Sequence, residues 1–216
     1  MKPLYIEARK KFKDEDINLK LLDNLKSKTV SLAATIQYID LIPKIKSYLE
    51  SLNKKVIIKQ GACHKAHVLG CNSSALDKSA GTILIITDGK FHAINNAIQI
   101  QKEIYVFDTK NLSKIKKEEI DQHNKNTLAK KKIFLSSNIV GILVSTKPRQ
   151  KNNAINQIVK KIEEQNKRVY VFEADNINTN EFENFPQIKI WINTSCLGLA
   201  RDDKRIINLT DISELL

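Results

Sequence analysis

Near the middle of the chain stands Gly81-Thr82-Ile83-Leu84-Ile85-Ile86-Thr87, a run with four consecutive large apolar side chains. A strand with one face in water alternates apolar and polar residues, whereas a strand covered on both faces is continuously apolar. The run therefore predicts a central strand with helices on both sides of its sheet. Apolar residues at helical spacing in residues 40–52 support that arrangement, with Asp40 as an expected cap and Pro43 in the first turn.

The same alternation of strands and helices continues to both ends of the chain. We expect helices at about 17–25, 40–52, 93–101, 114–138 (one or two) and 154–165, and strands at about 30–36, 55–58, 81–87, 103–107, 140–146, 168–172 and 188–192. Leu4-Tyr5-Ile6 is expected to be the end of a further strand. Alternation of this kind predicts parallel sheets.

An internal repeat divides the chain. Residues 30–58 contain a strand, a polar turn, an amphipathic helix and Asn53-Lys54-Lys55-Val56, and residues 140–172 repeat this order with Asn166-Lys167-Arg168-Val169. The offset of about 110 residues has the size of a domain. We predict an α/β protein with two repeated small α/β domains and central parallel sheets, at 29–134 and 135–216, preceded by a connection at 1–28.

Length and composition indicate a folded chain that does not enter a membrane. Its 216 residues are 42% hydrophobic, and no run approaches the ~18 apolar residues of a membrane span. The start, Met1 to Tyr5, has no secretory signal, so we expect a cytoplasmic location. Three cysteines are too few for a disulfide framework, and a reducing compartment leaves them as thiols.

The formal net charge of +12 raises the possibility of a nucleic-acid partner. However, the lysines are spread along the expected helices, without the interleaved aromatic residues on which single-strand binders stack bases. We therefore interpret the charge as a solvated basic surface and expect no nucleic-acid partner.

The segment Gln60 to Asn72 holds two of the three cysteines, Cys63 and Cys71, and two of the four histidines. It follows the expected strand 55–58, and loops at the carboxyl ends of parallel strands are where ligands bind in open α/β sheets. Thiolates with nearby imidazoles suit zinc or an iron-sulfur cluster. Seven residues separate the two cysteines, more than the about two to four of a zinc knuckle, so a self-contained zinc site is not expected. The alternative is that these cysteines are buried small apolar residues.

Several motifs together resemble one family. Val68-Leu69-Gly70-Cys71, Asp88-Gly89-Lys90-Phe91-His92, the Val144-Ser145-Thr146 turn with Gln150, and Cys196 after an apolar strand are similar, in order and spacing, to the 2-(3-amino-3-carboxypropyl)histidine synthases of diphthamide biosynthesis. The resemblance covers nearly the whole chain.

The resemblance implies a metal centre and a reaction. Members of that family have three repeated α/β domains, each giving one cysteine to a 4Fe-4S cluster whose remaining iron binds S-adenosylmethionine. Its cleavage yields a 3-amino-3-carboxypropyl radical that attacks a histidine of translation elongation factor two. Cys71 resembles the second-domain ligand and Cys196 the third-domain ligand. Residues 1–28 resemble a remnant of the first domain, so its cysteine is missing, and Cys63 is a candidate substitute.

The same resemblance suggests which residues bind the cofactor. Gly89 would allow close approach of the backbone, Phe91 could pack on adenine, and His92 or Gln37 could hold polar groups, with Gln150 in the corresponding turn of the second half. Each has an ordinary alternative, such as a simple turn for Gly89 or a core position for Phe91. The chain departs from the family pattern at Ala66-His67 and at Leu197-Gly198, beside the two cysteines.

These observations lead to one hypothesis of function and one alternative. The first is a radical S-adenosylmethionine aminocarboxypropyl transferase that modifies elongation factor two and works as a homo-oligomer or with a separate chain that supplies the missing domain. The alternative is a non-catalytic iron-sulfur partner or scaffold subunit of such an enzyme. We expect Cys71 and Cys196 to face a common cleft, and a partner to join near Leu4 to Ile6.

Overall fold

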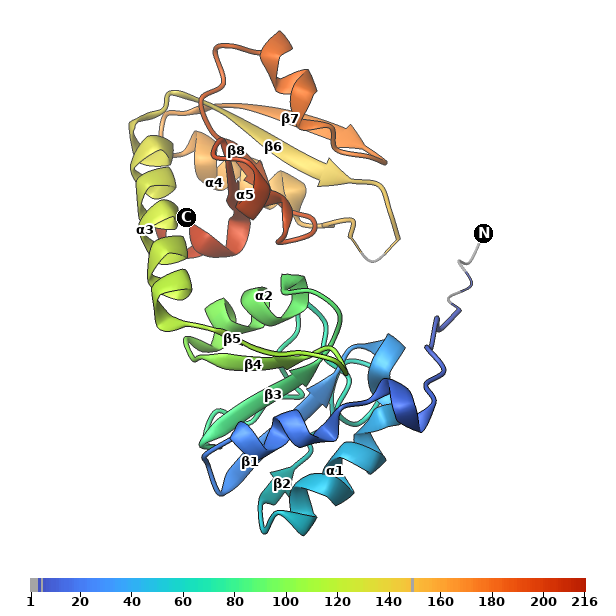
Figure 1. The fold of residues 1–216 in the computed structure, drawn as a ribbon. Helices are drawn as coiled ribbons and strands as arrows, with labels where there is room; N and C mark the ends of the chain where they lie inside the picture. Colours follow the sequence, from blue (N-terminus) through green and yellow to red (C-terminus); the bar gives the residue numbers. More distant parts are fainter. Residues whose placement is uncertain (1–3, 5, 149) are drawn as a thin grey trace. The chain divides into compact units, whose positions relative to one another are not determined.

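The computed structural model describes residue 4 and residues 6–148 and 150–216. The chain divides into two compact units, Met1–Asp121 and Gln122–Leu216, each with its own sheet and core (Figure 1). The division falls inside helix α3 (Lys117–Ser136). The boundary expected from the sequence, between residues 134 and 135, lies nearer the end of this helix.

The first unit contains a five-stranded sheet in the order β2-β1-β3-β4-β5. Its strands are β1 (Thr29–Ala34), β2 (Lys55–Ile57), β3 (Thr82–Ile86), β4 (Ile104–Phe107) and β5 (Leu112–Ile115). All neighbours are parallel except β4 and β5. All five residues of β3 are buried, which confirms the central strand predicted from its unbroken apolar run.

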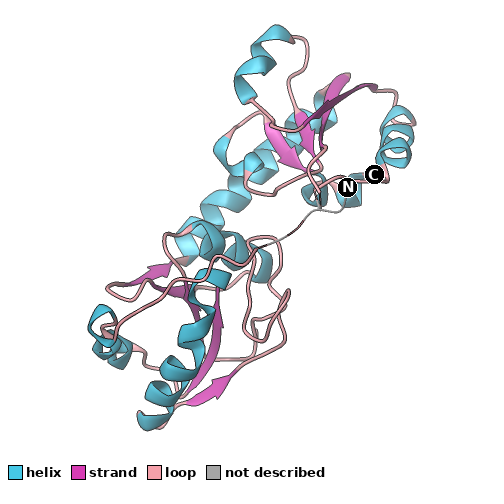
Figure 2. Ribbon diagram, turned by 90° about the vertical axis from the view of Figure 1, so that its right-hand side faces the viewer, coloured by secondary structure: helices cyan, strands magenta, loops and turns pink. Residues whose placement is uncertain are grey.

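Helices cover both faces of this sheet (Figures 1 and 2). Helix α1 (Ile42–Ser51) buries Ile45 and Leu49 in a core with alternate residues of β1 and β3, and α2 (Phe91–Ile100) packs against the opposite face. The remaining helical segments of the unit are the 3-10 turns η1 (Asp14–Asp16), η2 (Leu19–Asn24) and η3 (Ile36–Leu41).

The second unit contains a four-stranded sheet in the order β7-β6-β8-β9, in which all neighbours are parallel. Its strands are β6 (Ile139–Ser145), β7 (Arg168–Ala174), β8 (Trp191–Asn193) and β9 (Ile206–Asn208). Its helical segments after α3 are α4 (Ile155–Glu163), η4 (Thr179–Asn184), α5 (Leu199–Asp202), η5 (Leu209–Asp211) and η6 (Ser213–Leu215). Ile158 and Ile162 of α4 pack on one face, while Phe182 of η4 stacks on Trp191 on the other.

The two units share one strand order, which confirms the predicted repeat. In each unit the second strand lies beside the first, followed by the third and the fourth. The local geometry also repeats, since Asn53 and Asn166 have φ angles of 57° and 59°. The lysines that follow them then bind carbonyl oxygens just before the first strand: Lys54 those of Leu25 and Ser27, and Lys167 those of Leu135 and Ser137.

Several details differ from the sequence-based expectations. Residues 19–24 form a 3-10 segment where an α-helix was expected. Asp40 does not cap α1: η3 runs directly into the helix, Leu41 takes the N-cap position, and the Asp40 carboxylate pairs with Arg9 instead. The short strands β5 and β9 were missed. Leu4 and Ile6 lie outside regular structure, and Tyr5 and Arg149 are outside the described residues.

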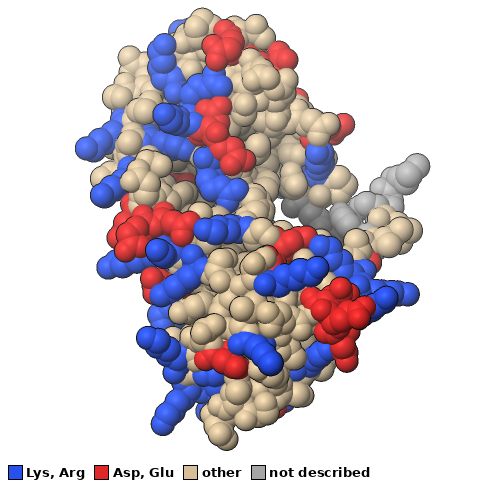
Figure 3. All heavy atoms as spheres, in the orientation of Figure 1, with Lys and Arg blue, Asp and Glu red and all other residues tan. Residues whose placement is uncertain are grey.

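Charge and hydropathy agree with a solvated surface. On the face shown in Figure 3, Lys and Arg side chains are spread over both units and interleaved with Asp and Glu. None of the helices in the described part of the chain combines the length and the apolar character that crossing a bilayer requires.

Candidate functional site

The cysteine loop of the first unit leaves β2 and returns to the sheet beside the end of β1. The amide of Ala34 donates to the carbonyl oxygen of Ala66, and the amide of Val68 donates to that of Ala34, both at 2.9 Å. The segment Val68 to Cys71 therefore lies at the carboxyl edge of the parallel strands. This is the position that the sequence predicted for the loop.

The start of the loop is folded tightly upon itself. The amide of Ala62 donates to the His67 carbonyl oxygen at 2.9 Å, and a Cβ atom on Gly61 would lie 2.0 Å from that same oxygen. Only glycine fits there, because any side chain would displace backbone. Ala66 completes the turn with a φ of 64°.

Helix α2 fixes the residues immediately before Cys71. The side-chain amide of Asn96 donates to the Leu69 carbonyl oxygen at 2.8 Å, and that of Gln99 donates to the Gly70 carbonyl oxygen at 2.7 Å. A Cβ atom on Gly70 would lie 3.3 Å from Phe91 Cε1, so the loop backbone rests against the start of α2. Cys71 follows this held segment, and its thiol is exposed.

The other candidate residues of this unit also follow the carboxyl ends of strands. Gln37 lies in η3, directly after β1. Gly89 lies between β3 and α2 with a φ of 64°, and a Cβ atom at this residue would have no neighbour within 4 Å. Phe91 and His92 open α2, with ring centroids 5.3 Å apart in an edge-to-face arrangement. Phe91 is 38% exposed, so its ring is available to a ligand. The roles proposed for these residues remain predictions.

An N-terminal segment, Glu7 to Lys10, is tied to three loops at this edge. Lys10 Nζ bonds the Asp88 carboxylate at 2.7 Å and the Tyr38 hydroxyl at 3.1 Å, and the Lys10 amide donates to the Gln37 carbonyl oxygen at 2.9 Å. The bond from Lys10 lowers the pKa of Asp88, so this carboxylate stays ionised. Glu7 contacts the His64 ring at 2.5 Å, which lowers the pKa of Glu7.

Two imidazoles, His67 in the cysteine loop and His92 in α2, favour their neutral form. Burial lowers the pKa of His92, and burial together with the neighbouring His64 lowers the pKa of His67. His67 is 5% exposed, and both of its ring nitrogens have no hydrogen-bond partner among the described residues. This imidazole stands at one of the two positions where the sequence departs from the family pattern.

Cys63 is exposed in the first part of the loop. Within residues 6–148 and 150–216, no group of three or more His, Cys, Asp and Glu side chains is arranged to hold a metal ion. The role of Cys63 as a substitute ligand stays a prediction.

The second unit presents Cys196 in a comparable way. The Asn193 side-chain amide, at the end of β8, donates to the Cys196 carbonyl oxygen and to Asn208 Oδ1, both at 2.8 Å, while Asn193 Oδ1 accepts from the Ser195 amide at 3.0 Å. Ser195 Oγ accepts from the Ser145 amide at the end of β6. Cys196 thus leaves a held loop at the carboxyl edge of its sheet, with its thiol exposed.

Gln150 lies in the exposed turn after β6, where its backbone amide donates to the Lys147 carbonyl oxygen at 3.0 Å. Sequence reasoning placed this residue correctly after the strand but missed the supporting amides Asn96, Gln99, Asn193 and Asn208. A polar residue that ends an apolar strand, as Asn193 and Asn208 both do, is the one signal that could have indicated them.

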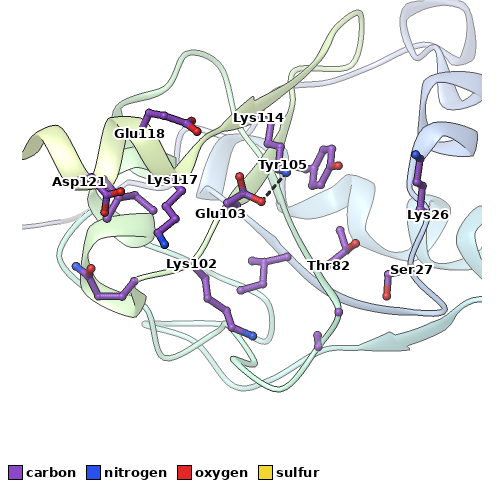
Figure 4. A pocket seen from close by; sticks show the side chains of 15 residues that line it. Lys26, Ser27, Thr82, Lys102, Glu103, Tyr105, Lys114, Lys117, Glu118 and Asp121 are labelled. Carbon is purple, nitrogen blue, oxygen red and sulfur yellow. Dashed lines mark ion pairs between the residues drawn. The ribbon is translucent and has the colours of Figure 1, made fainter.

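A large pocket of the first unit lies at the opposite edge of its sheet. It has a volume of about 930 Å³ and is lined by residues at the amino ends of β3 and β4, among them Thr82 and Glu103, and by Lys114 of β5, which forms an ion pair with Glu103 (Figure 4). None of the candidate residues lines it. The chemistry indicated by the cysteines is therefore separate from this pocket.

Cys71 in the first unit and Cys196 in the second thus each have an exposed thiol at the carboxyl edge of parallel strands, on a loop held by side-chain amides. Thiolates are the ligands of iron-sulfur clusters, so this donor set fits such a group in kind. The expectation that Cys71 and Cys196 face one cleft remains a prediction, because the two cysteines belong to different units and each unit is described by itself.

Known proteins that are similar in sequence to this chain belong to the family that its cysteine motifs resemble. A family model of diphthamide synthesis proteins matches residues 1–206. A 2-(3-amino-3-carboxypropyl)histidine synthase from Methanocaldococcus jannaschii is 29% identical over 217 residues, covering 94% of this chain and 57% of the relative. The chain therefore spans little more than half the length of this relative.

Solved structures share the fold. A crystal structure of Dph2 from Pyrococcus horikoshii has a TM-score of 0.80 at 23% identity, covering 92% of this chain and 62% of that chain. A crystal structure of the same protein with a 4Fe-4S cluster has a TM-score of 0.79 at 24% identity, covering 91% and 60%. The match to the family model over nearly the whole sequence decides the assignment: this chain belongs to the diphthamide synthesis protein family.

Proposed function

We propose that the chain takes part in the first step of diphthamide biosynthesis, the transfer of a 3-amino-3-carboxypropyl group from S-adenosylmethionine to a histidine of translation elongation factor two, in the cytoplasm. The observation that carries the proposal is the pair of exposed thiols, Cys71 and Cys196, each on a supported loop at the carboxyl edge of its sheet. Its relative from Methanocaldococcus jannaschii is named as a synthase of the modified histidine.

Cys71 and Cys196 would hold a 4Fe-4S cluster, with Cys63 or a cysteine of another chain as the third ligand. Three thiolates leave one iron open to the amino and carboxylate groups of a cofactor, and such a cluster supplies the electron for cleavage of the sulfonium. The supported loops would keep the ligand backbones in place. A homo-oligomer or a separate chain would complete the site by supplying this third cysteine. The chain spans 57% of the relative's length.

The chain's own residues would bind and orient S-adenosylmethionine. Gly89 leaves open space above its backbone, so a ligand can approach closely. The exposed ring of Phe91 can pack on adenine, and the neutral His92 can accept or donate one hydrogen bond. Gln37 and Gln150 would supply amide contacts from the turns that follow the first strand of each unit.

A second candidate is a non-catalytic iron-sulfur partner or scaffold subunit of such an enzyme. The observation that favours it is the position of the thiols. Cys71 and Cys196 lie on loops held by side-chain amides, one fewer than the three thiolates that leave a single iron open, and the third exposed cysteine, Cys63, lies in the first part of the same loop as Cys71. The fold and both cysteines would be the same for either function.

Anaerobic reconstitution separates the two candidates. The protein is loaded with iron and sulfide, then given S-adenosylmethionine and a reductant, and the cleaved aminocarboxypropyl product is measured. We expect an iron-sulfur absorption band and cleavage. A bound cluster without cleavage, also in the presence of elongation factor two, would assign the partner function. A chain that takes up no iron would overturn the transferase proposal.

A further inference from the structure

Lys10 links two loops at the carboxyl edge of the first sheet. Its Nζ atom donates to the Asp88 carboxylate at 2.7 Å and to the Tyr38 hydroxyl at 3.1 Å, while its backbone amide donates to the Gln37 carbonyl oxygen at 2.9 Å. The two side-chain partners follow different strands, since Tyr38 lies in η3 after β1, and Asp88 follows β3. One ammonium group therefore bridges two neighbouring loops.

The η3 side of this bridge is fixed by packing. Tyr38 is 3% exposed and belongs to the core that α1 forms with β1 and β3. The centroid of its ring lies 4.9 Å from Lys10 Nζ and 5.2 Å from the centroid of the Phe12 ring. Because the Lys10 amide also bonds Gln37, both the backbone and the side chain of Lys10 are attached to η3.

The Asp88 side of the bridge is a turn with fewer contacts. Asp88 precedes Gly89, which has a φ of 64° and no atom within 4 Å of a Cβ position. Glycine has more conformational freedom at such a position than any other residue. Within residues 6–148 and 150–216, Asp88 forms one salt bridge, the one with Lys10, and its carbonyl oxygen accepts from Thr87 Oγ1 at 3.2 Å. The ion pair with Lys10 therefore joins this turn to a different loop.

We infer that Lys10 is a positioning residue for the proposed S-adenosylmethionine site. By holding Asp88 beside the buried Tyr38, its ammonium group keeps the turn in the conformation in which Gly89 is open to a ligand. The inference rests on the proposed function, in which Gly89, Phe91 and His92 bind the cofactor. Lys10 acts on the cofactor through Asp88 and not by direct contact.

The ion pair is charged but exposed, which sets the size of its effect. The bonds to Asp88 and Tyr38 raise the pKa of Lys10, and the bond from Lys10 lowers the pKa of Asp88, so both groups are ionised at neutral pH. The side chains of Lys10 and Asp88 are 46% and 59% exposed, and such a pair contributes little to overall stability. Loss of the ammonium group should therefore affect the turn more than the fold.

Calorimetric titration with S-adenosylhomocysteine tests this role, because this thioether lacks the sulfonium that is cleaved. On the anaerobically reconstituted protein, Lys10→Met should raise the dissociation constant about two- to fivefold, the range that an exposed ion pair supports, and leave the melting temperature nearly unchanged. Lys10→Arg keeps the charge and should bind like the wild type. Lys46→Met breaks an exposed ion pair with Glu50 on α1 and should leave the affinity unchanged. Equal affinity of the wild type and Lys10→Met would overturn the inference alone.

A double-mutant cycle tests whether Lys10 acts through Asp88. Asp88→Asn should also weaken binding, and the variant with both substitutions should bind no more weakly than either single variant. Additive effects would show that Lys10 acts on the ligand directly and would overturn the positioning role. A wild-type chain that binds no S-adenosylhomocysteine would overturn the proposed function and this inference with it.

Discussion

The Asn193 side-chain amide donates a hydrogen bond to the carbonyl oxygen of Cys196 at 2.8 Å, and Asn193 is almost completely buried. A residue of the sheet thus holds the backbone of an exposed cysteine. In the first unit Gln99 does the same for the residue before Cys71. Both candidate ligands therefore combine an accessible thiol with a fixed main chain.

The first prediction follows from this support. Asn193→Ala removes bonds to Cys196, Asn208 and Ser195, and should lower the free energy of unfolding by about 2–3 kcal/mol, because buried polar groups lose their partners. Urea denaturation measures the loss, and hydrogen exchange should show faster exchange of the Ser195 amide. Asn184→Ala, which removes one exposed side-chain bond, is the control. Unchanged exchange at Ser195 would argue against this role for Asn193.

The second prediction compares two glycines. Gly61→Ala places a Cβ atom 2.0 Å from the His67 carbonyl oxygen, so the loop backbone must move, at a cost of about 3 kcal/mol or more. Gly89→Ala meets no atom and should cost only about 1–2 kcal/mol for its left-handed conformation. Thermal unfolding of both variants checks the order. Equal stability of the two would show that the cysteine loop is not held as described.

The third prediction concerns pH. Burial lowers the pKa of His67, so the folded chain binds this proton less readily than the unfolded chain. The contribution of neutral His67 to the free energy of unfolding should be fully present above the unfolded pKa of about 6.5. It should decline as the pH falls through that value toward the lower, folded pKa. His67→Phe has no such proton and no unpartnered ring nitrogens, so it should be at least as stable at pH 7.5.

Urea denaturation at pH 7.5 and 5.5 measures the effect on wild type and His67→Phe. The variant should lose less stability between these pH values than the wild type. The difference between the two losses should be about 1.4 kcal/mol for each unit by which burial lowers the pKa of His67. Some dependence on pH remains in both proteins, because burial also lowers the pKa of His92 and His123. The same slope in the two proteins would exclude a buried neutral His67.

Features with a strong local signal could be predicted from the sequence. β3 is recognisable by its unbroken apolar run, and the repeat is visible because Asn53-Lys54 and Asn166-Lys167 form the same turn and the same carbonyl contacts. The position of the Cys71 loop followed from the strand before it.

Other features depend on contacts between distant residues. β5 reads Leu-Ser-Lys-Ile and β9 has three residues, so neither carries enough pattern to be recognised without the strand beside it. Asp40 looked like a helix cap, but its carboxylate pairs with Arg9, which lies far away in the sequence. The support of Gly70 by Gln99 likewise arises only when α2 packs beside the loop.

Iron and sulfide counting after anaerobic reconstitution, on wild type and on Cys63→Ser, Cys71→Ser and Cys196→Ser, tests the central claim most directly. The account predicts that the wild-type chain holds a 4Fe-4S cluster and that Cys71→Ser and Cys196→Ser each lose most of the iron, while Cys63→Ser shows whether that thiol is the third ligand. A cluster retained in full by both Cys71→Ser and Cys196→Ser would contradict it.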